Sequence, residues 1–201
     1  MKVKSSIKIW IILGALVSAA TVLVVISPDE RTLGAGIKAV YVHVSLTWAG
    51  MLGFFLAGAL GILMLFKQSQ TIQNWSRAVS WVALIWFASG ASVSILAAKI
   101  NWGDVYWREP RMFATLQFLG IATLVLVAKS WLPWVRLQGV LNILIVVILL
   151  WSVVDVPLVL HPKNPVTTFD STTIQWTFVG MLLLSSLSAL CLVWRFVRAK
   201  G

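Results

Sequence analysis

The sequence contains two histidines, His43 and His161, and histidine is the side chain that most often binds a metal ion. A haem iron can take one axial ligand from each of two helices. If the fold brings the two histidines to the same depth, the pair could therefore hold one haem.

The segment 99–112 is the second candidate for ligand binding, because aromatic side chains alternate there with arginines and acids. Aromatic rings can cover a flat apolar molecule, and an arginine can grip a carboxylate through two hydrogen bonds. Haem is flat, apolar and carries two carboxylates. The alternative is an aromatic belt at a membrane surface. The expected pocket residues are Trp102, Gly103, Tyr106, Trp107, Arg108, Glu109 and Arg111.

The composition restricts the kind of protein that can carry these residues. Of the 201 residues, 60% are hydrophobic and 11% are charged, whereas a soluble domain is about 45–50% apolar and about 25% charged. This excludes a free soluble enzyme, a disordered chain and a nucleic-acid-binding domain, despite a net charge of +10. The single cysteine, Cys191, excludes an internal disulfide, and no C-x-x-C-H motif for covalent haem is present.

The apolar residues fall into segments long enough to cross a membrane, which takes about 20 residues. We expect an all-α fold, a polytopic membrane helix bundle of six transmembrane helices that forms a single domain over residues 1–201. The first segment is too long for a signal-peptide core of roughly 7–15 residues, so we expect it to be retained. The predicted spans are 7–26, 39–66, 78–98, 113–132, 138–160 and 174–194.

The basic residues predict the orientation. Ten of the sixteen lysines and arginines, and no acid, lie on the side that holds both termini. The positive-inside rule makes that side cytoplasmic, so the loops 27–38, 99–112 and 161–173 face outward. Both histidines then lie at the outer surface, where they either bind a metal or only form hydrogen bonds with lipid headgroups.

Other polar or small residues within the spans have plainer interpretations. Asp155 could orient a histidine ligand by a hydrogen bond, or simply reach outward as an interfacial carboxylate. Lys129 is expected to extend its ammonium group to the inner interface. Gly53, Ala57 and Gly61 are spaced for close helix packing, within the bundle or with a partner subunit.

Three stretches together resemble motifs of the CcmC/CcsA family, the haem-handling membrane proteins of cytochrome c biogenesis. Residues 38–44, KAVYVHV, resemble the family's R-x-x-Y-x-H-V-P segment, which carries an axial haem histidine. Residues 102–112 resemble its tryptophan-rich WWD signature, and residues 154–161, VDVPLVLH, resemble V-N-x-P-I-I-H. Six spans, with the signature between the third and the fourth, also agree.

The chain departs from the family pattern at several positions. Glu109 stands in place of the signature's aspartate, and Ser45 replaces the proline of the first motif. Asp170 stands where the family has its second axial histidine. The resemblance therefore assigns His43 as an axial ligand. His161 matches a histidine that is not a ligand in the family, but it is the other histidine available. Asp155 and Asp170 are the acids that could support a ligand.

The resemblance implies a haem carrier in the cytoplasmic (inner) membrane, not an enzyme. Its cargo would be haem b, held non-covalently and transiently at the outer face. It would pass haem to a CcmE-type periplasmic haem chaperone, beside a CcmA/CcmB-type ABC transporter and a small CcmD-type subunit, with no nucleic-acid partner. The alternatives are an electron-transferring b-type cytochrome subunit, and a small transporter or assembly factor without haem.

Overall fold

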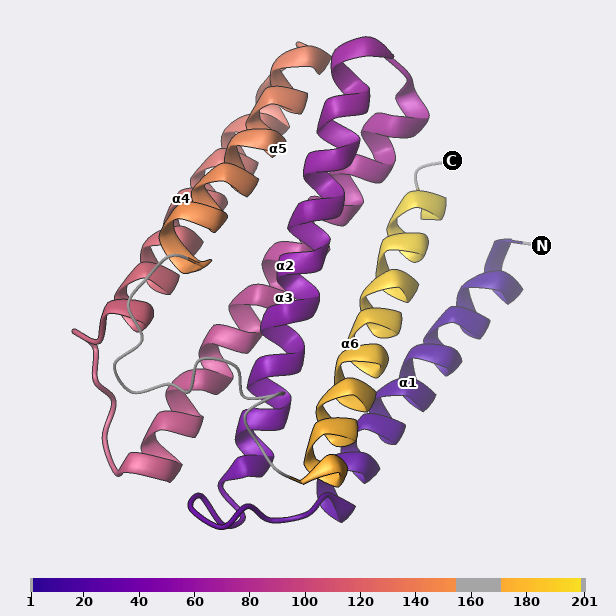
Figure 1. Ribbon diagram of the computed structural model, residues 1–201. Helices are drawn as coiled ribbons and strands as arrows, with labels where there is room; N and C mark the ends of the chain where they lie inside the picture. Colours follow the sequence, from indigo (N-terminus) through magenta and orange to yellow (C-terminus); the bar gives the residue numbers. More distant parts are fainter. Residues whose placement is uncertain (1, 155–170, 200–201) are drawn as a thin grey trace.

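The computed structural model describes residues 2–154 and 171–199, which are helical apart from short connections (Figure 1). The helices are α1 (Lys2–Ile26), α2 (Ile37–Phe66), α3 (Gln70–Trp102), α4 (Pro110–Trp131), α5 (Val135–Leu149) and α6 (Thr172–Ala199), with a π-helical turn η1 (Leu150–Val154) after α5. Six helices in these described residues are long and apolar enough to cross a membrane, the fifth when α5 is taken together with the start of η1 (Val135–Ser152). This confirms the predicted fold class and makes the chain a multi-pass membrane protein.

The helices lie where the hydropathy predicts them, but most extend further. α3 begins at Gln70, whereas the predicted span begins at residue 78. The additional turns are polar, so they continue the helix beyond the apolar stretch without changing the span. The fifth span was predicted to reach residue 160, and its α-helix ends at Leu149 and continues through η1 to Val154. Residues 155–160 lie outside the described residues.

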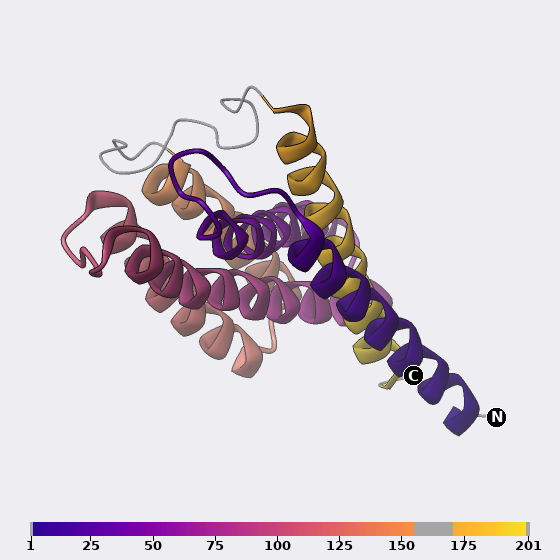
Figure 2. The same ribbon diagram turned by 90° about the horizontal axis from the view of Figure 1, so that it is seen from below.

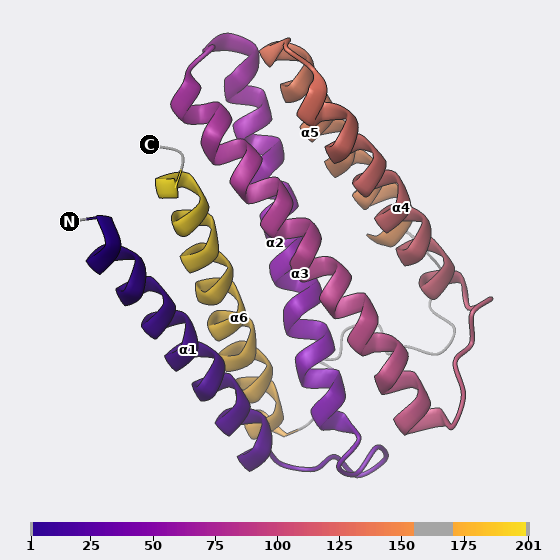
Figure 3. The same ribbon diagram turned by 180° about the vertical axis from the view of Figure 1, so that it is seen from behind.

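The antiparallel helices α2 and α3 form the centre of the bundle. Helices α4 and α5 cover one flank of this pair, and α1 lies beside α6 on the other flank (Figures 1 and 2). The view from behind shows the same order (Figure 3), with both chain termini at one end. This end also carries the connections α2–α3 and α4–α5, while the connections α1–α2 and α3–α4 lie at the opposite end.

Small residues allow the central helices to approach closely. A β-carbon on Gly50 would lie 2.6 Å from the backbone nitrogen of Phe87, and one on Gly61 would lie 2.6 Å from the carbonyl oxygen of Gly139 on α5. A β-carbon on Gly53 would come within 2.8 Å of the Ala83 methyl. Of the two interpretations of this small-residue pattern, packing within the bundle is therefore the one that the structure supports.

Contacts made by aromatic side chains join helices on both flanks to the centre. Phe118 of α4 packs edge-to-face against Phe54 of α2 and Phe87 of α3, with ring centroids 5.3 and 5.0 Å apart. On the other flank, Trp86 of α3 donates a hydrogen bond from Nε1 to Ser185 Oγ of α6 at 3.0 Å. These contacts hold α4 and α6 against the central pair.

We predict that Gly61→Ala weakens the bundle by roughly 1–3 kcal/mol, because the new methyl meets a backbone carbonyl that cannot move aside. The matched control is Gly120→Ala on α4, where a β-carbon has nothing within 4 Å and alanine favours the helix by up to about 1 kcal/mol. Unfolding of the detergent-solubilised variants measures both. Equal stability of the two variants would contradict the close α2–α5 contact.

Candidate functional site

His43 lies in the second turn of α2 and points toward α3. Its Nδ1 lies 2.8 Å from the carbonyl oxygen of Gly90, and Thr47 Oγ1 lies 3.3 Å from the same nitrogen. A carbonyl oxygen only accepts hydrogen bonds, so Nδ1 carries the proton and donates. In the neutral ring Nε2 is then the nitrogen with the lone pair, the atom that would coordinate a metal in this tautomer. A hydrogen bond of this kind fixes the orientation of a ligating imidazole.

The glycine at position 90 is what brings this carbonyl within reach. A β-carbon there would lie 2.7 Å from the backbone nitrogen of Thr47, so any larger residue would push α2 away from α3. Ser92 and Ser94 donate their hydroxyl hydrogens to backbone carbonyls of their own helix. On α3, the backbone carbonyl of Gly90 is thus the acceptor that the His43 ring reaches.

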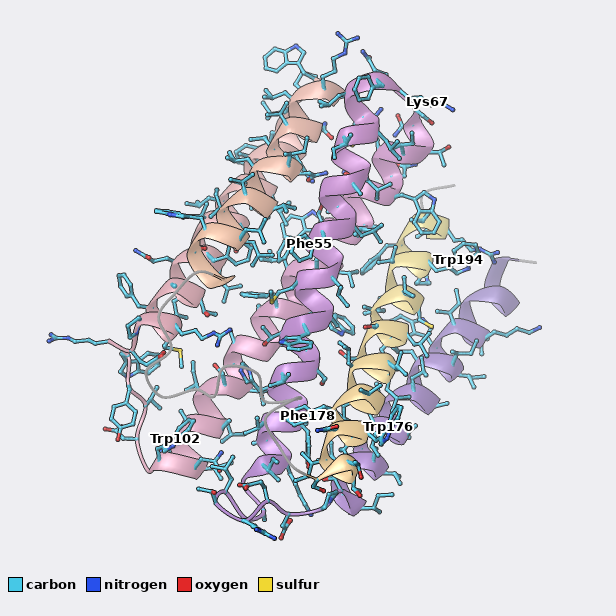
Figure 4. All side chains as sticks on the ribbon, in the orientation of Figure 1. Phe55, Lys67, Trp102, Trp176, Phe178 and Trp194 are labelled. Atoms are coloured by element: carbon cyan, nitrogen blue, oxygen red, sulfur yellow. The ribbon has the colours of Figure 1, made fainter. Side chains whose placement is uncertain are left out.

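The aromatic-rich segment lies at the same end of the bundle as the start of α2. Asn101 Nδ2, in the last turn of α3, donates to the carbonyl oxygen of Gly36 at 3.3 Å, immediately before α2 begins. α3 ends at Gly103, whose left-handed backbone (φ +79°) turns the chain out of the helix. Trp102 is seen at this end in Figure 4, and Lys67 at the opposite end.

The connection 103–109 between α3 and α4 presents most of the expected pocket residues to its surroundings. Tyr106, Trp107 and Arg108 are exposed, as is Trp102 just before the connection, and Arg111 is half-buried in the first turn of α4. These rings and guanidinium groups are therefore placed where they can meet a flat ligand that carries carboxylates. The same exposure also fits an aromatic belt.

Glu109 differs from its neighbours because it is only 7% exposed. It is the N-cap of α4, where its Oε2 accepts a hydrogen bond from the backbone N–H of Met112 at 2.7 Å. Pro110 follows at the first helical position, where its missing N–H does no harm. The carboxylate of Glu109 thus sets where the connection ends and α4 begins.

Three residues of the predicted site, His161, Asp155 and Asp170, lie outside the described residues. The expected meeting of the two histidines therefore stays a prediction. Within residues 2–154 and 171–199, no group of three or more His, Cys, Asp or Glu side chains is placed to hold a metal ion. An iron already held by a porphyrin needs only axial side chains.

The prediction for Lys129 is wrong. Its side chain does not reach the interface but is 4% exposed, and its Nζ donates to Ser80 Oγ at 3.1 Å and to Asn142 Oδ1. A lysine near the end of an apolar helix, taken alone, predicts a side chain that extends to the interface, so this buried site was not predicted. Ser76, Ser80 and Asn142 are polar residues within otherwise apolar helices, and they were the available signal for a buried polar partner.

Comparison with known proteins found no relative of this chain. No protein-family model matches it, and no curated protein matches it significantly. The likeness to the CcmC/CcsA family therefore rests on the three sequence motifs.

We predict that Glu109→Ala lowers the stability of the solubilised protein by roughly 0.5–2 kcal/mol, because the Met112 N–H loses its acceptor. Glu109→Asp keeps a capping carboxylate and should retain most of the stability. Arg108→Ala, at the exposed neighbouring position, is the control and should leave thermal unfolding unchanged. A Glu109→Ala variant as stable as wild type would show that the cap does not hold α4.

Proposed function

We propose that the protein binds haem at the end of the bundle formed by the start of α2 and the connection 103–109, and delivers it to another protein. The observation that carries this proposal is the hydrogen bond from His43 Nδ1 to the Gly90 carbonyl. It supports the proposal because it orients the ring and, in the neutral imidazole, leaves the lone pair on Nε2, as an axial iron ligand requires.

Other residues at this end of the bundle could bind the carboxylates and the apolar surface of a haem. Arg108 and Arg111 are the cations that would pair with its carboxylates, and Tyr106 and Trp107 are exposed rings that would cover its apolar surface. No general acid, base or nucleophile is assigned here. The protein would thus act on haem as cargo, by holding and releasing it, and not as an enzyme.

The cellular setting of the proposal follows from the charge distribution and the family resemblance. The site would face the periplasmic side of the cytoplasmic membrane, with both termini inside. His161 would supply the second axial ligand, and a CcmE-type chaperone would receive the haem. The ATP hydrolysis for this process would come from CcmA/CcmB-type subunits, since the sequence contains no nucleotide-binding motif.

We expect His43→Ala protein, purified from haem-replete cells, to lose the haem Soret absorption that the wild type shows. The variant lacks the oriented ligand but keeps the helix, since alanine favours helices. Added imidazole should restore part of the absorption by entering the vacated position. Loss of the band in His161→Ala as well would support two histidine ligands.

The matched control is Thr47→Val, which keeps the shape of the side chain and removes only the weaker contact to His43 Nδ1. It should retain the Soret band. A His43→Ala spectrum identical to that of the wild type would refute His43 as the ligand. Reversible reduction by quinol would instead favour the b-type cytochrome, and folded protein that never acquires haem would favour the haem-free transporter or assembly factor.

The proposed orientation has its own test. In a Cys191→Ser background, a cysteine at Asp104 should react in intact spheroplasts with a thiol reagent that cannot cross membranes, because position 104 is exposed in the outer connection. A cysteine at Lys67, exposed at the opposite end, should react only after the membrane is permeabilised. The reverse pattern would overturn the orientation.

A further inference from the structure

The buried lysine of α4 lies in a polar cluster made by three helices. Lys129 Nζ of α4 donates to Ser80 Oγ of α3 and to Asn142 Oδ1 of α5. Asn142 Nδ2 donates to Ser76 Oγ at 2.7 Å, and Ser80 Oγ donates to the Ser76 carbonyl at 2.8 Å. Asn142 is 1% exposed. The cluster is therefore enclosed by protein and consists of interlocking hydrogen bonds.

Among the described residues, the hydrogen-bond partners of Lys129 are neutral: Ser80 and Asn142. In the part of the chain that the structure describes, no carboxylate forms an ion pair with it. An ionisable side chain in a membrane span is costly unless it is well satisfied. The hydrogen bonds to α3 and α5 are thus what holds this side chain in the interior.

The rest of α4 is attached by an apolar seam. The residues of α4 that are buried recur about every fourth position along one face: Met112, Ala114, Phe118, Ala122, Leu126 and Lys129. In a membrane, apolar contacts between helices have little advantage over contacts with lipid tails, which are equally apolar. Such a seam alone resists sliding and rotation of the helix weakly. A lysine bonded to two different helices resists both motions.

We propose that Lys129 is a positioning residue that fixes the rotation and depth of α4, and through α4 the placement of the connection 103–109. Lys129 and the end of the connection 103–109 are about 30 Å apart along the helix, at 1.5 Å per residue. α4 is continuous between them, from Pro110 to Trp131. A change at the Lys129 end is therefore transmitted to the end that carries the exposed rings. The inference rests on the proposed function only in assigning that connection to haem.

The test measures the position of α4 directly and needs no haem. In a Cys191→Ser background, spin labels at Phe113 in the first turn of α4 and at Leu52 of α2 occupy exposed positions. Pulsed dipolar spectroscopy then gives the distance distribution between them. We expect a single narrow peak for the wild-type cluster, and a shift or broadening of that peak in Lys129→Met. The variant Lys67→Met, at an exposed lysine of the same end, should keep the original peak.

Three further variants separate positioning from stability. Asn142→Asp keeps an oxygen acceptor for Lys129, so the wild-type distance peak should be retained. Asn142→Leu removes that acceptor, so the peak should shift or broaden. The double variant Lys129→Met with Asn142→Leu leaves no unpaired charge, which can be nearly neutral for stability, and should remain folded with a shifted or broadened peak. A wild-type peak in the folded double variant would overturn the proposal. Because the readout is a distance, absence of haem from the wild type would refute only the proposed function.

Discussion

The close approach of α2 to α3 is the contact on which the rest of the structure depends. Helices in a membrane gain little from apolar contact alone, so they associate where small residues let their backbones meet. Gly50, Gly53 and Gly90 provide such places between these two helices. Gly90 also leaves its carbonyl oxygen accessible to a side chain from the facing helix, and His43 uses it. One packing constraint thus produces both the centre of the bundle and the orientation of the candidate ligand.

The two ends of the bundle carry different chemistry, and continuous helices connect them. One end holds the exposed rings of the α3–α4 connection and the N-cap at Glu109, and His43 lies one to two turns inside the start of α2 at this end. Near the other end, Lys129 joins α4 to α3 and α5 through neutral acceptors. Since α4 runs without interruption between them, hydrogen bonds near one end constrain where side chains at the other end can lie.

Much of the fold could be predicted from the sequence, because a membrane helix must satisfy its backbone internally and be apolar over a fixed length. The six helices were predicted on this basis, and the errors lie at their ends. Hydropathy does not detect the polar first turns of α3, which extend beyond the apolar stretch. The spacing of Gly53 and Gly61 predicted close packing, but only the structure identifies α3 and α5 as the partners.

The candidate site was less predictable, since it depends on contacts between distant segments. The sequence singled out His43 and the aromatic segment by residue type, but not the carbonyl that orients the ring, because every residue has one. Lys129 was misjudged for the same reason: its acceptors are 49 and 13 residues away in sequence. The capping role of Glu109 could have been read locally from an acid directly before a proline.

The absorption spectrum of the wild-type protein is the most direct test of whether it binds haem. The protein would be purified in detergent from haem-replete cells that co-express its proposed partners, and measured oxidised and reduced. We expect a Soret band that shifts on reduction, with haem that is released by denaturation because it is not covalently bound. A folded, membrane-inserted protein with no Soret band would contradict it.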